Sequence, residues 1–130
     1  MSRLSGDIRV IVCGGRDFND KILCFETLEK MLSEYTSESV EIVSGHARGA
    51  DTFGEEYAKM HGIRLSIFKA DWKLYGKSAG PVRNSQMLKY ASEETPVVIA
   101  FWNGASKGTK NMIEQSRAAG ATVHVIMYKG

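Results

Sequence analysis

The chain has 130 residues, of which 43% are hydrophobic and 25% are charged, and its formal net charge is +2. This length fits one domain that buries its own core, so we expect a single domain over residues 1–130. The small net charge argues against a dedicated nucleic-acid module, which usually carries a clear basic excess. No apolar run approaches the ~20 residues of a membrane span.

The two cysteines are Cys13, which ends an apolar run, and Cys24, which lies in a helical pattern. Neither has the spacing of a metal site or of a disulfide framework, so both are interpreted as buried free thiols in a reducing compartment. No basic-then-apolar leader signal opens the chain. We therefore expect a cytoplasmic protein.

The expected strands are short apolar runs rich in β-branched residues, and the expected helices repeat apolar residues at helical spacing. Gly62 and Gly120 suit the C-terminal capping position of two helices, and Pro81 suits the first turn of another. Residues 69–80 are polar and show no periodicity. In chain order the expected elements are a strand at 8–13, a helix at 19–35, a strand at 40–43, a helix at 50–61, a strand at 63–68, a helix at 81–92, a strand at 96–101, a helix at 107–119 and a strand at 122–128.

This alternation predicts an α/β fold, a single Rossmann-like three-layer sandwich with a five-stranded parallel sheet between two layers of helices. Right-handed crossovers favour the strand order 3-2-1-4-5. The run at 96–101 is the most apolar and is expected inside the sheet, whereas 122–128 alternates more, as an edge strand does. Ligands of such sheets bind outside the carboxyl ends of the strands, near the point where strand order reverses. Here that point lies between the first and fourth strands.

The loops expected at that edge combine glycines with basic side chains. Glycine lets the backbone approach a ligand, helix N-termini point amides at an anion, and arginine grips phosphate oxygens. Neither the P-loop spacing nor the dinucleotide fingerprint is present. The loop glycines are eight of the 13 in the chain, namely Gly14, Gly15, Gly45, Gly49, Gly76, Gly80, Gly104 and Gly108, and the basic residues in or just beyond these loops are Arg16, Arg48, Lys77, Arg83 and Lys107. The pattern indicates a site for a phosphorylated ligand.

Individual residues of these loops have alternative roles. Arg16 is expected to contact the ligand, whereas Asp17 either contacts it or caps the first helix. Asp51 either hydrogen-bonds a ribose hydroxyl or stabilises the start of its helix through the dipole. His46 and His124 are isolated, so no metal is assigned, and no cofactor is expected. The expected ligand-binding residues are Gly14, Gly15, Arg16, Asp17, Ser44, Gly45, Ala47, Gly49, Asp51, Arg83, Asn84, Asn103, Gly104, Lys107, Gly108 and Thr109.

Five segments occur in an order that points to a known group of proteins. They are IVCGGRDF at 11–18, VSGHARGAD at 43–51, ADW and YGKSAG within 70–80, RNSQM at 83–87 and VIAFWNGASKGT at 98–109. As a set they resemble the SLOG superfamily, named for the DNA-processing protein A (Smf) and the LOG cytokinin-activating enzymes, and within it the small YspA-like proteins. The resemblance implies a Rossmann-like fold and a nucleotide-type ligand, often a signalling nucleotide or an ADP-ribose-like molecule. It also implies a homodimer or higher homo-oligomer that associates through the helices at 81–92 and 107–119.

The resemblance to the LOG phosphoribohydrolases is incomplete at one position. Arg83 begins a stretch similar to their Arg-Lys-x-x-Met segment, whose arginine helps to cleave an N-glycosidic bond. Their catalytic glutamate corresponds to Met112, which can neither take a proton nor stabilise an oxocarbenium-like centre. Glu114 is two residues further on, a rotation of roughly 200° around a helix. No catalytic residue is assigned, apart from Arg83 if the protein is an enzyme, and the departure favours binding.

Three functions therefore compete. The first is a binding module that senses or sequesters a nucleotide-derived signal such as an ADP-ribose-like or cyclic nucleotide, and the sequestering role would suit a phage or mobile element. The second is a nucleoside monophosphate phosphoribohydrolase in which Asp17, Asp51, Asp71 or Glu114 replaces the missing glutamate. The third is a single-stranded DNA binder, which the net charge and the scarcity of aromatic residues outside the core disfavour. No membrane partner is expected.

Overall fold

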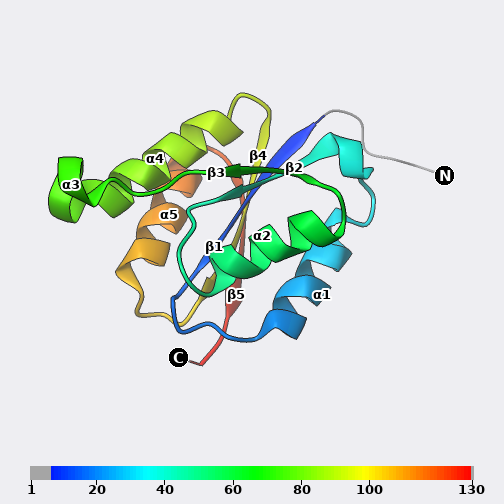
Figure 1. Cartoon of the computed structure of the whole chain (residues 1–130), viewed down its shortest axis with the longest axis horizontal. Helices are drawn as coiled ribbons and strands as arrows, with labels where there is room; N and C mark the ends of the chain where they lie inside the picture. The colour runs from blue at the N-terminus through cyan, green and yellow to red at the C-terminus, as the bar shows by residue number, and fades with distance from the viewer. Residues whose placement is uncertain (1–6, 130) are drawn as a thin grey trace.

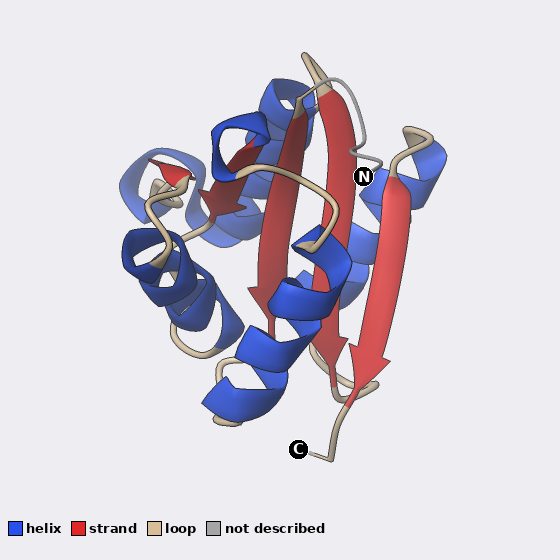
Figure 2. Ribbon diagram, turned by 90° about the vertical axis from the view of Figure 1, so that its right-hand side faces the viewer, coloured by secondary structure: helices blue, strands red, loops and turns tan. Residues whose placement is uncertain are grey.

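The computed structural model describes residues 7–129, so residues 1–6 and 130 of the expected domain lie outside the described residues. Its strands form one parallel sheet in the order β3-β2-β1-β4-β5, as predicted. Helices cover both sides of the twisted sheet (Figure 2). The strands are β1 (Ile8–Gly14), β2 (Val40–Ser44), β3 (Arg64–Ile67), β4 (Thr95–Trp102) and β5 (Thr122–Met127).

Each face of the sheet has its own core. Helices α1 (Lys21–Leu32) and α2 (Ala50–Met60) lie on one side, and α4 (Ala79–Ala91) and α5 (Lys107–Ala118) lie on the other (Figure 1). Because side chains alternate along a strand, Val12 packs with the first pair of helices and Ile11 with the second. The apolar run of β1 is therefore buried on both faces, which explains why its sequence shows no polar alternation. Within the described chain, no helix combines the length and apolarity that a membrane crossing needs.

The first helix is shorter than the expected 19–35. It begins at Lys21 because the Asp20 carboxylate accepts a hydrogen bond from the amide of Leu23 at 3.0 Å, which satisfies a free donor of the first turn. The proposal that Asp17 caps this helix is therefore wrong. The helix ends at Leu32, and a short 3-10 helix at Ser37–Ser39 leads into β2.

Residues 69–80 contain structure that the absence of periodicity concealed. They include a short helix, α3 (Trp72–Tyr75), whose first turn is capped by Asp71, and a 3-10 helix at Gly76–Ser78. Neither buries a side chain, so neither leaves an apolar repeat in the sequence. Helix α4 then begins two residues before Pro81, which places Arg83 in the second turn of the helix and not in the first.

A polar cluster joins the sheet to α4 far from the carboxyl ends of the strands. The buried carboxylate of Glu41 accepts hydrogen bonds from the hydroxyls of Ser66 and Tyr90 and pairs with Arg9 at 3.2 Å. Burial alone would raise the pKa of Glu41, but these donors and the positive charge together lower it below its ordinary value. Since every acceptor is matched by a donor, the cluster holds β1, β2, β3 and α4 in register.

Gly54 lets α2 approach β1 closely. A Cβ at this position would lie 2.9 Å from the Cβ of Val12, a stiff side chain of the core. We expect Gly54→Ala to lower the free energy of unfolding by about 1–3 kcal/mol, although alanine favours a helix by about 1 kcal/mol. Urea unfolding followed by circular dichroism would measure this change.

Gly108 provides the matched control, because it is also helical but a Cβ there would meet no atom within 4 Å. We expect Gly108→Ala to leave stability unchanged or raise it by up to about 1 kcal/mol. Equal effects of the two substitutions would contradict the close approach.

Candidate functional site

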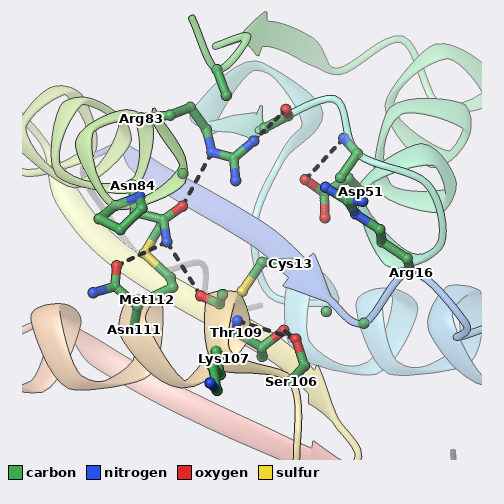
Figure 3. A pocket seen from close by; sticks show the side chains of 18 of the residues that line it. Cys13, Arg16, Asp51, Arg83, Asn84, Ser106, Lys107, Thr109, Asn111 and Met112 are labelled. Atoms are coloured by element: carbon green, nitrogen blue, oxygen red, sulfur yellow. Dashed lines mark hydrogen bonds between the residues drawn. The ribbon is translucent and has the colours of Figure 1, made fainter. Parts of the chain in front are cut away.

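A cavity of about 860 Å³ lies beyond the carboxyl ends of β1, β2 and β4. Of the expected ligand-binding residues, all but Ser44, Gly49 and Gly104 line it. Figure 3 shows Arg83 and Asp51 on one side of it, with the first turn of α5 opposite. The lining residues are Cys13, Gly14, Gly15, Arg16, Asp17, Gly45, His46, Ala47, Arg48, Asp51, Lys69, Ala70, Trp72, Lys77, Gly80, Pro81, Arg83, Asn84, Met87, Asn103, Ser106, Lys107, Gly108, Thr109, Asn111 and Met112.

The three expected residues outside the cavity wall shape the loops instead. Ser44 is buried, and its hydroxyl donates to Glu55 at 2.7 Å. Gly49 has a φ of +87°, and a Cβ there would lie 2.3 Å from the carbonyl oxygen of Gly15. Gly104 also has a positive φ, in the turn before α5. Part of the glycine pattern thus serves contacts between loops.

Arg83 is held in place before any ligand arrives. Its Nη1 donates to the carbonyl of Gly45 at 2.9 Å, and its Nε donates to the side chain of Asn84 at 3.2 Å. Asn84 is buried and in turn donates to the carbonyl of Gly108 and to the side chain of Asn111. These bonds, drawn in Figure 3, tie α4 to the loop after β2 and to the start of α5. They engage two guanidinium nitrogens and leave Nη2 for a ligand.

The first turn of α5 borders the cavity, and hydrogen bonds fix the loop that leads into it. The carboxamide oxygen of Asn103 accepts hydrogen bonds from the amides of Ala105 and Ser106 at 2.8 and 2.9 Å. The hydroxyl of Ser106 then accepts from the amide of Thr109, as an N-cap does. The remaining amides of the turn and the Lys107 ammonium favour a negative charge at this wall.

Positive charge dominates the cavity wall. Asp17 and Asp51 are its carboxylates, and Asp17 accepts a hydrogen bond from the hydroxyl of Tyr128 at 2.5 Å. Burial raises the pKa of Tyr128 to about 12, and the contact with Asp17 adds to the rise. The basic residues of the wall are Arg16, Arg48, Lys69, Lys77, Arg83 and Lys107. Such a surface attracts phosphorylated ligands.

Asp51 lies almost entirely below the surface, with 4% of its area exposed. Its carboxylate accepts from the amide of Ala47 at 3.4 Å and so holds the loop after β2. Burial raises the pKa of Asp51 to about 7, against the opposing effects of that amide, of Arg83 and of the Gly45 amide. Asp51 lies in the first turn of α2, which fits the expected role of stabilising the start of the helix. It also lines the cavity, which fits the expected hydrogen bond to a ribose hydroxyl.

The floor of the cavity is apolar at Met112, the position to which the resemblance to LOG enzymes assigned their catalytic glutamate. Met112 is 1% exposed and belongs to the core beneath α5. Burial raises the pKa of the neighbouring Cys13 thiol, which is also free of disulfide bonds. Glu114 is exposed and Asp71 caps α3, and neither lines the cavity. Of the carboxylates considered as substitutes, Asp17 and Asp51 remain at the site.

Several lining residues were missed. Arg48 and Lys77 belong to the basic loop residues identified in the sequence. The same combination of loop position and positive charge could therefore have placed them among the expected ligand-binding residues. Asn111 lies one helical turn after Lys107, a spacing that puts both on one side of α5. Lys69 precedes the unpredicted helix α3 and Trp72 begins it, and both residues line the cavity. Among the described residues, no three His, Cys, Asp or Glu side chains are grouped closely enough to hold a metal ion.

The raised pKa of Asp51 predicts a pH-dependent stability. Between its ordinary value of 3.8 and about 7, the unfolded carboxyl ionises while the folded one stays protonated. The folded state binds more protons in this window, so the contribution of Asp51 to stability falls as pH rises and is lost above about pH 7. We expect a change of roughly 2–4 kcal/mol, measured as the difference between wild type and Asp51→Asn in urea unfolding from pH 4 to 8.

Asp71→Asn is the matched control, because Asp71 is exposed and does not line the cavity. The loss of stability between pH 4 and 8 that is expected of Asp51 should be absent from the difference curve for Asp71→Asn. A flat curve for Asp51→Asn as well would show that the Asp51 carboxyl is not destabilised by burial.

Comparisons with known proteins agree with this architecture. The gene 61 protein of Mycobacterium phage D29 is 30% identical over 120 residues, which cover 88% of this chain and 93% of that protein. The structure is similar to DNA processing protein A (DprA) from Streptococcus pneumoniae, with a TM-score of 0.52 and 16% identity, a likeness of fold. The match covers 92% of this chain but 59% of DprA. A model of the YspA, cpYpsA-related SLOG family (YAcAr) matches residues 8–75. The chain therefore belongs to the YspA, cpYpsA-related SLOG family.

Proposed function

We propose that this protein binds a phosphorylated nucleotide, or a signal derived from one, in the cavity at the carboxyl ends of β1, β2 and β4. The observation that carries the proposal is the fixed guanidinium of Arg83 within a wall of six basic and two acidic side chains. Two internal hydrogen bonds hold this guanidinium, so little side-chain entropy is lost when it meets a phosphate.

The shape of the cavity suits a ligand larger than a single phosphate. Its volume of about 860 Å³ is within the usual range for small-molecule sites. Basic residues lie on either side of α3, at Lys69 and Lys77, and at the start of α5, at Lys107. Separate positive regions suit a ligand with more than one anionic group, such as an ADP-ribose-like molecule. A protein that sequesters such a signal needs no further partner, whereas a sensor would act through another protein or a second copy.

Hydrolysis of an N-glycosidic bond is the second candidate, and Asp51 is the observation that favours it. Its carboxylate lines the cavity and its pKa is raised to about 7, a value that suits an acid or base near neutral pH. Two features favour binding over this reaction. The carboxylate is engaged by backbone amides, and Met112 occupies the place where LOG enzymes carry their catalytic glutamate.

Nucleotide binding should raise the melting temperature, because a ligand that binds only the folded state stabilises it by mass action. A thermal-shift panel would contain AMP, GMP, ADP-ribose and cyclic nucleotides at millimolar concentration, with a single-stranded oligonucleotide included. We expect a shift with at least one nucleotide. A shift with the oligonucleotide alone would favour DNA binding, and no shift with any compound would contradict the proposal.

Arg83→Ala should weaken the binding of the nucleotide that gives the largest shift by about 1.5–3 kcal/mol, roughly 10- to 150-fold, if Arg83 makes a charge-assisted bond to phosphate. Titration calorimetry would measure the loss. Arg117→Ala is the charge-matched control, because Arg117 is exposed on α5 and does not line the cavity. Equal affinities of the two variants would rule out a phosphate contact by Arg83.

The wild-type protein should release little or no free base from nucleoside monophosphates, since a buried thioether cannot stabilise the positive charge that develops on the sugar. Chromatography after long incubation with AMP and GMP tests this expectation. Ready release of base that is abolished in Arg83→Ala would favour the hydrolase, and Asp51→Asn would then test the replacement carboxylate.

A further inference from the structure

His46 has a backbone conformation that histidine rarely adopts. Its φ is +60°, and among the described residues it is the one residue other than glycine with a positive φ. A hydrogen bond to the end of β2 stabilises this conformation, because the His46 amide donates to the hydroxyl of Ser44 at 3.0 Å. Unusual backbone conformations of this kind persist where the surrounding structure imposes them, and they cluster at ligand sites.

The imidazole is oriented by a buried carboxylate. Nδ1 of His46 lies 2.9 Å from Oε2 of Glu55, and Glu55 is 6% exposed. The same oxygen of Glu55 accepts a hydrogen bond from Ser44 at 2.7 Å. An ionised carboxylate can only accept hydrogen bonds, so Nδ1 carries a proton, and the lone pair of the neutral form of the ring lies on Nε2.

This nitrogen is available to a ligand. His46 lines the cavity, and its side chain is about half exposed there. Because Glu55 holds the other ring nitrogen on the buried side, Nε2 is the polar atom of the ring that a bound molecule can reach.

An uncharged acceptor of this kind complements the basic cavity wall. Its six basic side chains match the anionic groups of a nucleotide, but sugar hydroxyls also require partners that accept their hydrogen bonds. Of the carboxylates in the wall, Asp17 accepts from Tyr128 and Asp51 accepts from loop amides. A neutral imidazole nitrogen accepts a hydrogen bond without repelling a nearby phosphate, as a carboxylate would.

We propose that His46 is a ligand-contacting residue whose Nε2, oriented by Glu55, accepts a hydrogen bond from a hydroxyl of the ligand's ribose. The assignment rests on the proposed nucleotide binding and adds to it a recognition of ribose over deoxyribose. Glu55 acts through His46 and is a positioning residue.

The test compares the calorimetric affinities of AMP, 2′-deoxy-AMP and 3′-deoxy-AMP at pH 8. Wild type should bind AMP about 3- to 10-fold more tightly than one of the deoxy analogues, the effect of a single neutral hydrogen bond. His46→Gly should lose that preference, with AMP binding weakened to the level of the analogue. Glycine suits the positive φ, so this variant should fold.

His61→Ala is the matched control, because His61 caps α2 and packs on Tyr57 away from the cavity. It should keep the wild-type preference. Wild-type binding of AMP that is unchanged in His46→Gly would overturn the role of His46 and leave the proposed function standing. Failure of wild type to bind AMP or either analogue would overturn the ribose contact, and the wider nucleotide panel would then decide the proposed function separately.

A second measurement needs no ligand. Long-range proton–nitrogen NMR distinguishes the two tautomers of a neutral histidine, and it should show the proton of His46 on Nδ1. In Glu55→Gln the ring loses its anionic acceptor, so the spectrum should move toward a mixture of tautomers. A wild-type spectrum with the proton on Nε2 would overturn the proposal.

Discussion

The pairing of β1 with β4 is the constraint on which the site depends. The two strands are in register from Ile8 against Thr95 to Gly14 against Phe101, while the other edge of β1 pairs with β2. From β1 the chain continues to β2 and β3 on one side of the sheet and then to β4 and β5 on the other side. Right-handed crossovers therefore place α1 and α2 on one face and α4 and α5 on the other. The loops diverge above β1, and the space between them becomes the cavity.

Much of this arrangement follows from local sequence signals. The runs around Val10 and Ile99 are apolar on both faces, and this pattern predicted the buried parallel strands. Their order was predicted from the alternation of strands and helices together with right-handed crossovers. Gly62 and Gly120 end α2 and α5 with positive φ, as their positions indicated. The edge of the sheet at which the cavity lies could therefore be predicted without coordinates.

Other features depend on contacts between distant segments, which periodicity does not record. Helix α3 buries no side chain and leaves no repeat, so the helix was not predicted, and Lys69 and Trp72 were not among the expected ligand-binding residues. His46 was interpreted as an isolated histidine, because its partner Glu55 is nine residues away and meets it only after α2 folds against β2. The tie between Arg83 and Gly45 spans 38 residues and has no local signature.

The contact between Asp17 and Tyr128 has a consequence for the order of events in synthesis. The loop after β1 is made early, but the hydroxyl of Tyr128, 111 residues later, binds Asp17 beside Gly15. A Cβ at Gly15 would lie 2.1 Å from that hydroxyl, so loop and tyrosine are closely fitted. A nascent chain that has not yet added β5 lacks this support for the wall that carries Arg16. The part of the wall that carries Arg16 therefore gains this contact only after β5 has joined the sheet and Tyr128 has packed beside Gly15.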